Sequence, residues 1–173
     1  MQYGRPRRPG RHGGRGGADA NAEILRREFA ARGVDASGLV IDPARPTNVY
    51  GKLCAGSYNA PVQEVLRTDT PTPPFIAGAV EDQLIEMISA LAPDLDAIAV
   101  VDQVCSVATD RVLKAVTECA AKHGLLTVGD SRERAGALKD FDVVVPNDRE
   151  AGKGVGIDVV DDQTFLAAGR ALL

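Results

Sequence analysis

The sequence contains little cysteine, and its three cysteines are Cys54, Cys105 and Cys119. An odd number without paired close spacing argues against a disulfide framework and a cysteine zinc site, so we expect reduced and mostly buried thiols. No apolar run approaches the ~18 residues that a membrane span needs, and the N-terminus lacks the apolar core of a signal peptide. We therefore expect a cytoplasmic protein without a membrane segment.

The sequence also lacks an excess of basic charge. It has 20 basic and 24 acidic residues and a net charge of −4, which argues against nucleic acid as a partner. Residues 1–17 are the exception, because they contain no acid and consist mainly of Gly, Arg and Pro. Such a segment cannot bury enough apolar surface to offset its ordering, so we predict a disordered tail over residues 1–18. A solvated tail or a displaced translation start explains it better than RNA binding, since Tyr3 is its only aromatic residue. Its arginines are Arg5, Arg7, Arg8, Arg11 and Arg15.

The chain has 173 residues, the length of one domain, which at this size buries about 70% of its unfolded surface. Apolar residues at helical spacing predict a helix over 19–32, with an aspartate placed to cap it. A short strand is predicted at 39–41. Two extended segments at 47–55 and 64–68, joined by the turn-rich GSYNAP, predict an antiparallel hairpin. The strands of residues 39–69 thus form a small β-hairpin lid.

After the proline-rich TPTPPF the pattern changes to strands that are apolar throughout, separated by amphipathic helices. This alternation is typical of a parallel sheet covered by helices on both faces. Residues 79–173 are therefore predicted to be α/β, and the fold class is α/β: a Rossmann-like parallel sheet with flanking helices plus the hairpin lid. The expected strands cover 96–102, 125–130 and 142–146, and the expected helices cover 80–91, 109–123, 133–138 and 161–173.

Polar residues follow each of the three expected parallel strands. Ligands gather at the carboxyl ends of such strands, so these residues are candidates for a binding site. Each one alone is better explained as a cap of the following helix. Three groups at one edge of a sheet are a stronger indication of a ligand site. They are Asp102, then Asp130 and Arg132, then Asn147 and Glu150.

The glycine-rich AGKGVG, residues 151–156, suggests a phosphate-binding loop, but its spacing does not fit one. Lys153 has Asp148 five residues before it and Gly154 after it, where a Walker-type loop needs Gly and then Ser or Thr. The glycines are also wrongly spaced for a dinucleotide fingerprint. We interpret them as loop flexibility and Lys153 as a solvated charge.

Asn147 and Glu150 remain open to two interpretations. Residues three apart at the start of a helix share a face near the positive end of the helix dipole. A carboxylate there can hold a magnesium-bound water while the amide reaches a phosphate oxygen. A capping box, in which a polar residue is followed three residues later by Glu, has nearly the same pattern. The residues alone favour neither.

Four segments resemble the PfkB/ribokinase family of carbohydrate kinases, and together they span about residues 19–173. VVVPNDREA contains the Asn-x-x-Glu motif that organises magnesium and the triphosphate in the family. ARGVDASGLVIDPARPTNVYGKL resembles the GVD turn and the entry into the strand that covers the sugar. VQEVLRTD resembles the second covering strand, most like that in the heptose-phosphate kinase domain of ADP-heptose synthases. AIAVVDQVCSVATDRVLKAV resembles a strand, Asp, small loop and helix of the family.

The resemblance implies an incomplete ribokinase-like fold and ATP-dependent phosphorylation of a hydroxyl of a sugar or sugar phosphate. It implies ATP and Mg²⁺ as cofactors at Asn147 and Glu150, with the Mg²⁺ held through water. Family members often pair through the covering strands, so a homodimer through the lid is expected. The implied substrate-binding residues are Tyr50, Lys52 and Arg67 on or near the covering strands, and Asp102 in the substrate cleft.

The sequence departs from the family at both ends. The upstream GGAxxN segment is imitated only by GGADAN, residues 16–21, in which Asn21 is one residue late. We interpret Gly17 to Asp19 as the remains of a later GDD turn of the family. The GAGD motif with the catalytic base is expected beyond Leu173. Phosphoryl transfer depends on groups that converge from several loops, so the resemblance implies a fragment that binds weakly and turns over little or nothing.

A fragment of a parallel sheet exposes unpaired strand edges, so we expect a marginally stable or aggregation-prone product. One alternative is a non-catalytic binding module or a decayed gene product with a Rossmann-like domain. Another is a different Rossmann-like enzyme that binds a nucleotide or sugar nucleotide. The absence of a Gly-rich turn after the first parallel strand argues against the latter.

Overall fold

The computed structural model describes residues 9–71, 74–103 and 106–172. Contacts between residues divide the chain into two compact units, Met1–Pro73 and Pro74–Leu173. The first unit combines a parallel strand pair with an antiparallel hairpin, and the second contains a three-stranded parallel sheet. This mixed α/β architecture confirms the predicted fold class.

The body of the first unit consists of β1 (Arg11–Gly16), α1 (Ala20–Ala31) and β2 (Asp35–Ile41). The two strands pair in parallel, an arrangement that requires a crossover connection such as α1. Asp19 caps α1, since its Oδ1 accepts a hydrogen bond from the N–H of Ala22 at 3.0 Å. The predicted helix is therefore confirmed, while β2 begins earlier than predicted.

Strand β1 corrects the prediction of a disordered tail for residues 11–16. Its sequence, RHGGRG, contains no aliphatic side chain, but its backbone pairs with β2. A Cβ on Gly16 would lie 3.2 Å from the Cβ of Ala22, so glycine lets α1 approach the strand closely. Arg15 is 9% exposed because carbonyl groups accept hydrogen bonds from its guanidinium. Composition misses this strand because backbone pairing and a satisfied arginine replace apolar burial. Residues 1–8 lie outside the described residues.

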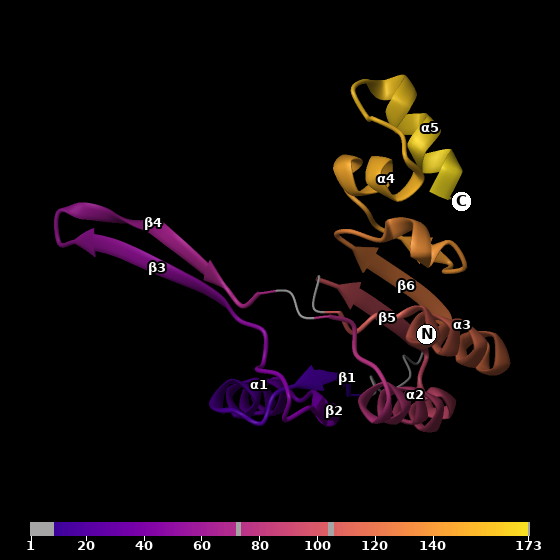
Figure 1. Cartoon of the computed structure of the whole chain (residues 1–173), viewed down its shortest axis with the longest axis horizontal. Coiled ribbons are helices and arrows are strands. Elements are labelled where there is room, and N and C mark those ends of the chain that lie inside the picture. Colours follow the sequence, from indigo (N-terminus) through magenta and orange to yellow (C-terminus); the bar gives the residue numbers. More distant parts are fainter. Residues whose placement is uncertain (1–8, 72–73, 104–105, 173) are drawn as a thin grey trace, which may run out of the picture. The chain divides into compact units, whose positions relative to one another are not determined.

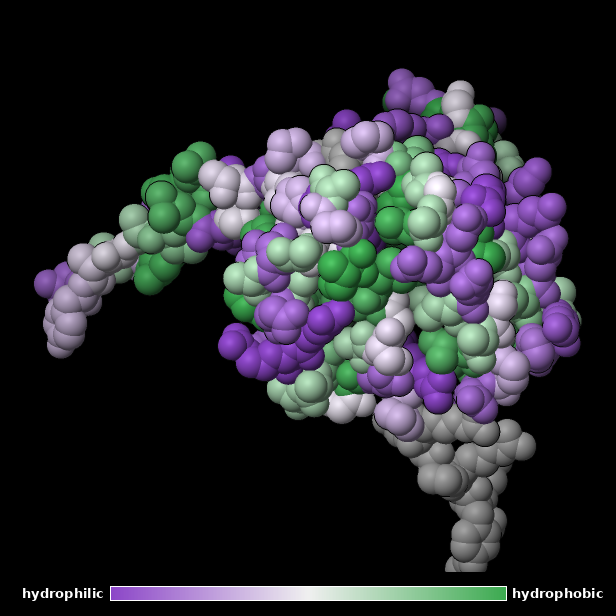
Figure 2. All heavy atoms as spheres, turned by 60° about the horizontal axis from the view of Figure 1, so that its bottom comes forward, coloured by the Kyte–Doolittle hydropathy of each residue, from purple (hydrophilic) through white to green (hydrophobic). Residues whose placement is uncertain are grey.

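Strands β3 (Tyr50–Ser57) and β4 (Ala60–Asp69) form the predicted antiparallel hairpin, which Figure 1 shows as a long arm. Among the described residues these strands pair only with each other, and neither strand contains a buried residue. Figure 2 shows hydrophobic side chains, in green, gathered on this arm. Its exposed aliphatic side chains are Leu53, Val62, Val65 and Leu66, at 61, 73, 61 and 53%.

The second unit is built on a parallel sheet with the strand order β5–β6–β7. Its strand residues agree with the sequence pattern, although β7 is only two residues long and a 3₁₀ turn, η2, replaces one predicted short helix. The strands are β5 (Ala97–Asp102), β6 (Leu126–Ser131) and β7 (Val143–Val144). The helices are α2 (Ala79–Leu91), η1 (Ala92–Asp94), α3 (Asp110–His123), η2 (Ala135–Leu138), α4 (Asp148–Val155) and α5 (Asp162–Leu172).

The main core of the second unit lies on one face of this sheet. Leu138 and Val116 are 1 and 2% exposed, and Ile98 and Val100 of β5 pack against their cluster. Side chains alternate between the faces of a strand, and Val101 is 66% exposed. The prediction that helices cover both faces is therefore wrong for β5.

The cysteine prediction is only partly met. Cys54 on β3 is exposed, which corrects the expectation of a buried thiol, and Cys119 is half-buried. Cys105 lies outside the described residues. None of the helices in the described ranges combines the length and the apolar character needed to cross a bilayer.

Candidate functional site

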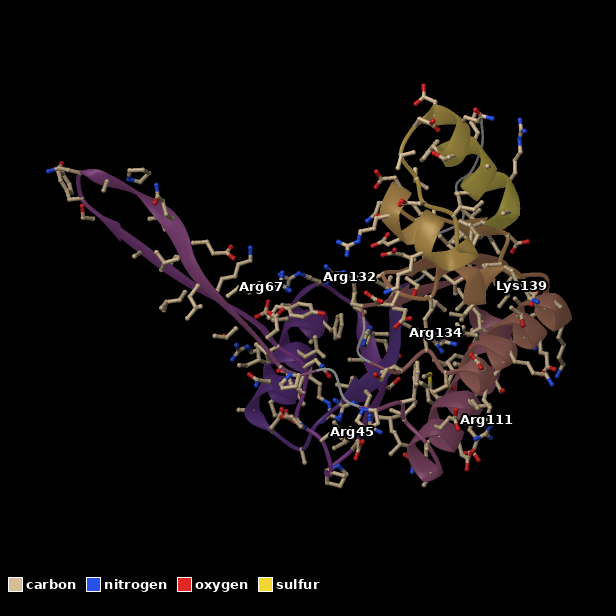
Figure 3. The ribbon with its side chains drawn as sticks, turned by 45° about the horizontal axis from the view of Figure 1, so that its top comes forward. Arg45, Arg67, Arg111, Arg132, Arg134 and Lys139 are labelled. Carbon is tan, nitrogen blue, oxygen red and sulfur yellow. The ribbon has the colours of Figure 1, made fainter. Side chains whose placement is uncertain are left out.

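The hairpin brings together three residues that the sequence resemblance implicates in substrate binding. Tyr50 and Lys52 are two apart on β3, and Lys52 lies opposite Arg67 of β4, so the three side chains share one face. The guanidinium carbon of Arg67 lies 4.6 Å from the centre of the Tyr50 ring, a cation–π contact. Figure 3 labels Arg67 on this hairpin. The predicted substrate residues of the lid thus form one cluster.

Acidic residues on the same face pair with both cations. Lys52 Nζ lies 2.7 Å from Glu64 Oε2, and Arg67 Nε donates to Asp69 Oδ1 at 2.7 Å. The hydrogen bond to Asp69 raises the pKa of Arg67 above its usual value, so this side chain is always charged. Exposed pairs of this kind are weak, because water screens them. An incoming anionic group can therefore take the place of either carboxylate.

Asp102, at the end of β5, lies beside the last residues of β6. Its Oδ2 accepts a hydrogen bond from Ser131 Oγ at 2.9 Å, and the Ser131 hydroxyl accepts one from the N–H of Arg134 at 3.0 Å. Asp102 and Ser131 are 8 and 1% exposed. Asp130 accepts a hydrogen bond from Gln103 Nε2 at 3.2 Å. The structure thus brings the first two predicted polar groups together.

The sequence does not indicate that Ser131 belongs to this polar group. It belongs to no motif, and only its pairing opposite Asp102 in the parallel sheet makes it the partner of that carboxylate. Arg132, a candidate site residue from the sequence, donates its backbone N–H to the carbonyl of Asp102 at 3.3 Å. Figure 3 labels Arg132 and Arg134 in this region.

Asn147 and Glu150 form the capping box that the sequence left open. Asn147 Oδ1 accepts a hydrogen bond from the Glu150 N–H at 2.9 Å, and Glu150 Oε2 accepts one from the Asn147 N–H at 2.9 Å. Each side chain uses one polar atom in this way. Asn147 Nδ2 and Glu150 Oε1 make no hydrogen bond within the described residues. The cap therefore fixes both side chains and leaves a donor and an acceptor for a ligand.

These two side chains fit a hydrated magnesium ion better than a metal cage. Among the described residues, no group of three or more His, Cys, Asp or Glu side chains is placed to hold a metal ion. Mg²⁺ usually keeps several waters and takes one or two carboxylates together with phosphate oxygens of a substrate. One carboxylate oxygen beside an amide donor suits that mode of binding.

An acidic cavity lies beside the same helix start. It has a volume of about 400 Å³. The hydrogen bond from the backbone N–H of Thr164 lowers the pKa of Asp161, as does the bond from its hydroxyl, so this carboxyl is ionised at neutral pH. Like charges repel, so the cavity itself is a poor place for a triphosphate. Its lining residues are Asp148, Val159, Val160, Asp161, Asp162 and Phe165.

The glycine run after Glu150 is helix rather than loop. Gly152, Lys153 and Gly154 belong to α4, and Gly156 ends it with φ +73°. A Cβ on Gly154 would lie 2.8 Å from the backbone N of Gly136 in η2, so these glycines allow two elements to touch. The predicted loop flexibility is wrong for this reason.

Lys153 forms an ion pair with Glu133, which precedes η2. The predicted solvated charge is thus half exposed, and it also has an ion-pair partner, which the sequence did not predict. Both side chains are about half exposed, so the pair contributes little to stability. Together with the glycine contact it joins α4 to the segment that follows β6.

Comparisons with known proteins identify the fold first. No family model matches the chain. A PfkB protein from Polaromonas superposes with a TM-score of 0.61 and 17% identity, covering 94% of this chain and 57% of that one. A ribokinase from Arabidopsis thaliana, complexed with ribose and ATP, superposes with a TM-score of 0.60 and 15% identity, covering 95% of this chain and 51% of that one. The chain therefore has the fold of the PfkB/ribokinase sugar kinases.

Sequence comparison then points to a particular relative. The chain is 29% identical over 158 residues to "Bifunctional protein HldE" of Citrifermentans bemidjiense, covering 91% of this chain and 31% of that protein. It is thus a homologue of HldE proteins and spans about a third of the length of this relative. This agrees with the carbohydrate-kinase family that its motifs resemble.

Proposed function

We propose that the chain is part of an ATP-dependent kinase that phosphorylates a hydroxyl of a sugar phosphate, nearest the heptose-phosphate kinases. The start of α4 carries the proposal. There the capping box holds Asn147 and Glu150 in place while Asn147 Nδ2 and Glu150 Oε1 stay available. A donor and a carboxylate at the positive end of a helix suit a nucleotide phosphate with its hydrated Mg²⁺.

Each residue has a distinct role in this proposal. ATP bound there supplies the phosphoryl group. The Asn147 amide donates a hydrogen bond to a phosphate oxygen, and the Glu150 carboxylate accepts hydrogen bonds from waters on the Mg²⁺. The capping box restricts both side chains before the ligand arrives, which lowers the entropic cost of binding.

The hairpin is proposed to hold the sugar phosphate. The Tyr50 ring offers an apolar surface for the sugar, and the cations of Lys52 and Arg67 attract the phosphate. Because the ion pairs with Glu64 and Asp69 are exposed, a phosphate can replace either carboxylate as the partner of these cations. Asp102, ordered by Ser131, is proposed as a further substrate-binding residue, on the second unit.

Nucleotide binding is tested by calorimetric titration of the purified 173-residue chain with MgATP. Asn147→Asp keeps the oxygen that accepts from Glu150 and replaces the amide donor with a negatively charged oxygen, which repels a phosphate. Glu150→Gln keeps one oxygen that can accept for the cap, removes the charge and replaces the second carboxylate oxygen with an NH2 group. We expect weak binding that falls about tenfold or more in each variant, since a lost bond to a charged group exceeds a factor of ten.

Asp162→Asn, at the acidic cavity beside α4, is the matched control and is expected to leave the affinity within a factor of about two. Absence of MgATP binding by the native chain would overturn the nucleotide part of the proposal. Equal affinity in all three variants would overturn the assignment to Asn147 and Glu150.

Turnover by the chain alone is proposed to be very low. The chain covers 57% and 51% of the two kinases to which it was compared, and phosphoryl transfer needs groups from several loops. The test is an ATP-consumption assay with a heptose phosphate, ribose and fructose. Appreciable turnover that Glu150→Gln abolishes would contradict the low-turnover proposal. Binding of neither nucleotide nor sugar phosphate would favour the alternative of a non-catalytic binding module.

We also propose a homodimer through the hairpin strands. Leu53 and Leu66 are opposite each other and more than half exposed, so a second copy can cover them. Sedimentation velocity is expected to show a dimer that Leu53→Glu combined with Leu66→Glu converts to a monomer. Ile24→Glu on α1, also at an exposed apolar site, is the control. A monomeric native chain, or a dimer unaffected by the paired change, would contradict this arrangement.

A further inference from the structure

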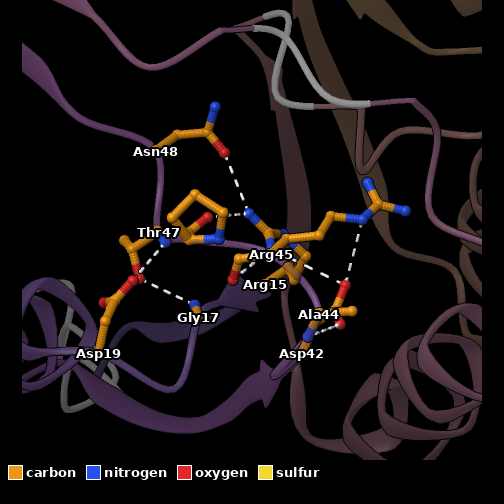
Figure 4. A network of polar contacts seen from close by, with 9 residues as sticks. Arg15, Gly17, Asp19, Asp42, Ala44, Arg45, Thr47 and Asn48 are labelled. Carbon is orange, nitrogen blue, oxygen red and sulfur yellow. Dashed lines mark hydrogen bonds and ion pairs between the residues drawn. The ribbon is translucent and has the colours of Figure 1, made fainter.

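The loop between β2 and the hairpin is held by an arginine from β1. Arg15 Nη2 donates to the carbonyl of Pro46 at 2.6 Å and to Asn48 Oδ1 at 3.1 Å, and its Nη1 donates to the carbonyl of Arg45 at 3.4 Å. The Arg15 side chain is 2% exposed. Figure 4 shows the guanidinium among these loop residues. One buried side chain thus binds a segment about thirty positions away in the sequence.

Asp42 lies in the same network and balances the buried positive charge. Its Oδ2 lies 3.8 Å from Arg15 Nη1 and 3.2 Å from Arg45 Nε. Its Oδ1 accepts a hydrogen bond from the N–H of Ala44 at 3.0 Å. A buried charge is costly unless it is paired and hydrogen-bonded, and these contacts meet that requirement.

Thr47 fastens the other side of the loop to the start of α1. Its N–H donates to Asp19 Oδ2 at 2.7 Å, and its hydroxyl donates to Asp19 Oδ1 at 2.8 Å. The Thr47 hydroxyl also accepts a hydrogen bond from the N–H of Gly17 at 2.8 Å. Hydrogen bonds therefore hold the loop both to Gly17, which follows β1, and to Asp19, which caps α1 (Figure 4).

The hairpin beyond this loop lacks such support. In the described part of the chain β3 and β4 pair only with each other, and no residue of either strand is buried. The direction in which Tyr50 and Lys52 leave the body of the first unit is therefore set at the root of β3, directly after Asn48.

We propose that Arg15 is a positioning residue that anchors the loop of residues 42–48 and thereby sets the placement of Tyr50 and Lys52 on the hairpin. The importance of that placement rests on the proposed function, in which these two residues contact the sugar phosphate. The anchoring itself does not, because it is a property of the free chain.

Hydrogen exchange on the full chain, followed by mass spectrometry, tests the anchor. In Arg15→Ala we expect the amides of the non-proline residues between 42 and 49 to exchange about tenfold faster, which corresponds to about 1.4 kcal/mol. The amides in the middle of α1, in the same unit as the loop, should keep their native rates, which shows that this unit is still folded. Arg15→Lys, which keeps a charge but loses the forked geometry, should recover only part of the protection.

Two further variants keep the test decisive. Asn48→Ala removes one acceptor of Arg15 without altering β1 and should speed exchange only around residues 46–49. Arg32→Ala removes an exposed arginine paired with Glu28 and should change nothing in the loop. Native exchange rates in both Arg15→Ala and Asn48→Ala would overturn the anchor, whatever the chain binds.

Binding separates this inference from the proposed function. If a heptose phosphate binds the native chain, Arg15→Ala should weaken it several-fold while Arg32→Ala does not. If the heptose phosphate does not bind the native chain, while exchange in the loop still accelerates in Arg15→Ala, the substrate proposal fails and the proposal that Arg15 anchors the loop stands. Unchanged affinity in Arg15→Ala would contradict the positioning role.

Discussion

The sheet of the second unit and the hairpin of the first are both built from paired strands, yet they are held in different ways. The sheet packs Ile98 and Val100 against a core that contains Leu138 and Val116. The hairpin has no buried residue and relies on its backbone pairing, exposed ion pairs and one cation–π contact. Two-stranded hairpins without a core are marginally stable in water.

The two regions therefore suit different kinds of binding. The second unit can hold the start of α4 rigid, which suits recognition of a phosphate by fixed groups. The hairpin exposes both a polar face and aliphatic side chains, which suits a surface that becomes ordered when a ligand or a second copy covers it. In the proposed anchor, Arg15 of β1 holds the loop from which the hairpin extends.

The largest expected contrast comes from truncating one leucine in each region. Leu138→Ala should lower the free energy of unfolding by about 2–5 kcal/mol, because Leu138 is 1% exposed and its loss leaves a cavity. Leu66→Ala, at a site 53% exposed, should change it by no more than about 0.5 kcal/mol. Urea unfolding followed by circular dichroism measures both. Similar losses would mean that the hairpin is packed as firmly as the sheet.

Glycines in the second unit provide the next contrast. Gly154→Ala should destabilise the chain by about 1–3 kcal/mol, because the added Cβ would meet the backbone of Gly136 at 2.8 Å. Gly169→Ala, within α5 and with no atom near its Cβ position, should stabilise it by about 0.5–1 kcal/mol. Thermal and urea unfolding of both variants distinguish them. A neutral Gly154→Ala would contradict the close contact between η2 and α4.

The helix cap gives a smaller effect. Asn147→Ala removes the acceptor of the Glu150 N–H and should cost about 1 kcal/mol. Asn147→Asp keeps an acceptor at this position and should stay within a few tenths of a kcal/mol of the native chain. Urea unfolding measures both. If Asn147→Asp were as damaging as Asn147→Ala, the cap would not be the source of this stability.

The smallest effect is a dependence on pH. The backbone N–H of Thr127 and then its hydroxyl lower the pKa of Asp142. A carboxyl with a lowered folded pKa stabilises the fold above its usual pKa of ~3.9 and loses that contribution as pH falls through the folded value. Thr127→Val removes the hydroxyl and should therefore lose less stability than the native chain on acidification. Parallel acid curves for the two proteins would show that this bond is unimportant.

Local patterns predicted the helices and most strands well, for a physical reason. Helical spacing and caps are properties of neighbouring residues, so α1 with its Asp19 cap and the start of α4 are visible in the sequence. The Asn147–Glu150 capping box is equally local. The structure was needed only to show which atoms the capping box leaves available, namely Asn147 Nδ2 and Glu150 Oε1.

Features that depend on distant residues were missed. Composition predicts a disordered tail where β1 lies, because the stability of β1 comes from pairing with β2 and from the carbonyl groups around Arg15. The sequence predicts a loop at Gly154, because the residue that requires a glycine there, Gly136, is distant in the sequence. No sequence pattern indicates a role for Ser131, since its role is the hydrogen bond that it donates to Asp102 on the neighbouring strand.

The proposed nucleotide and sugar-phosphate sites are tested most directly by a map of amide chemical shifts on the ¹⁵N-labelled chain during titration, first with MgATP and then with a heptose phosphate. We expect MgATP to shift the amides of residues 147–151 and the heptose phosphate to shift those around Tyr50, Lys52 and Arg67. Shifts from MgATP elsewhere in the second unit with none at the start of α4, or no shift from either ligand, would contradict this expectation.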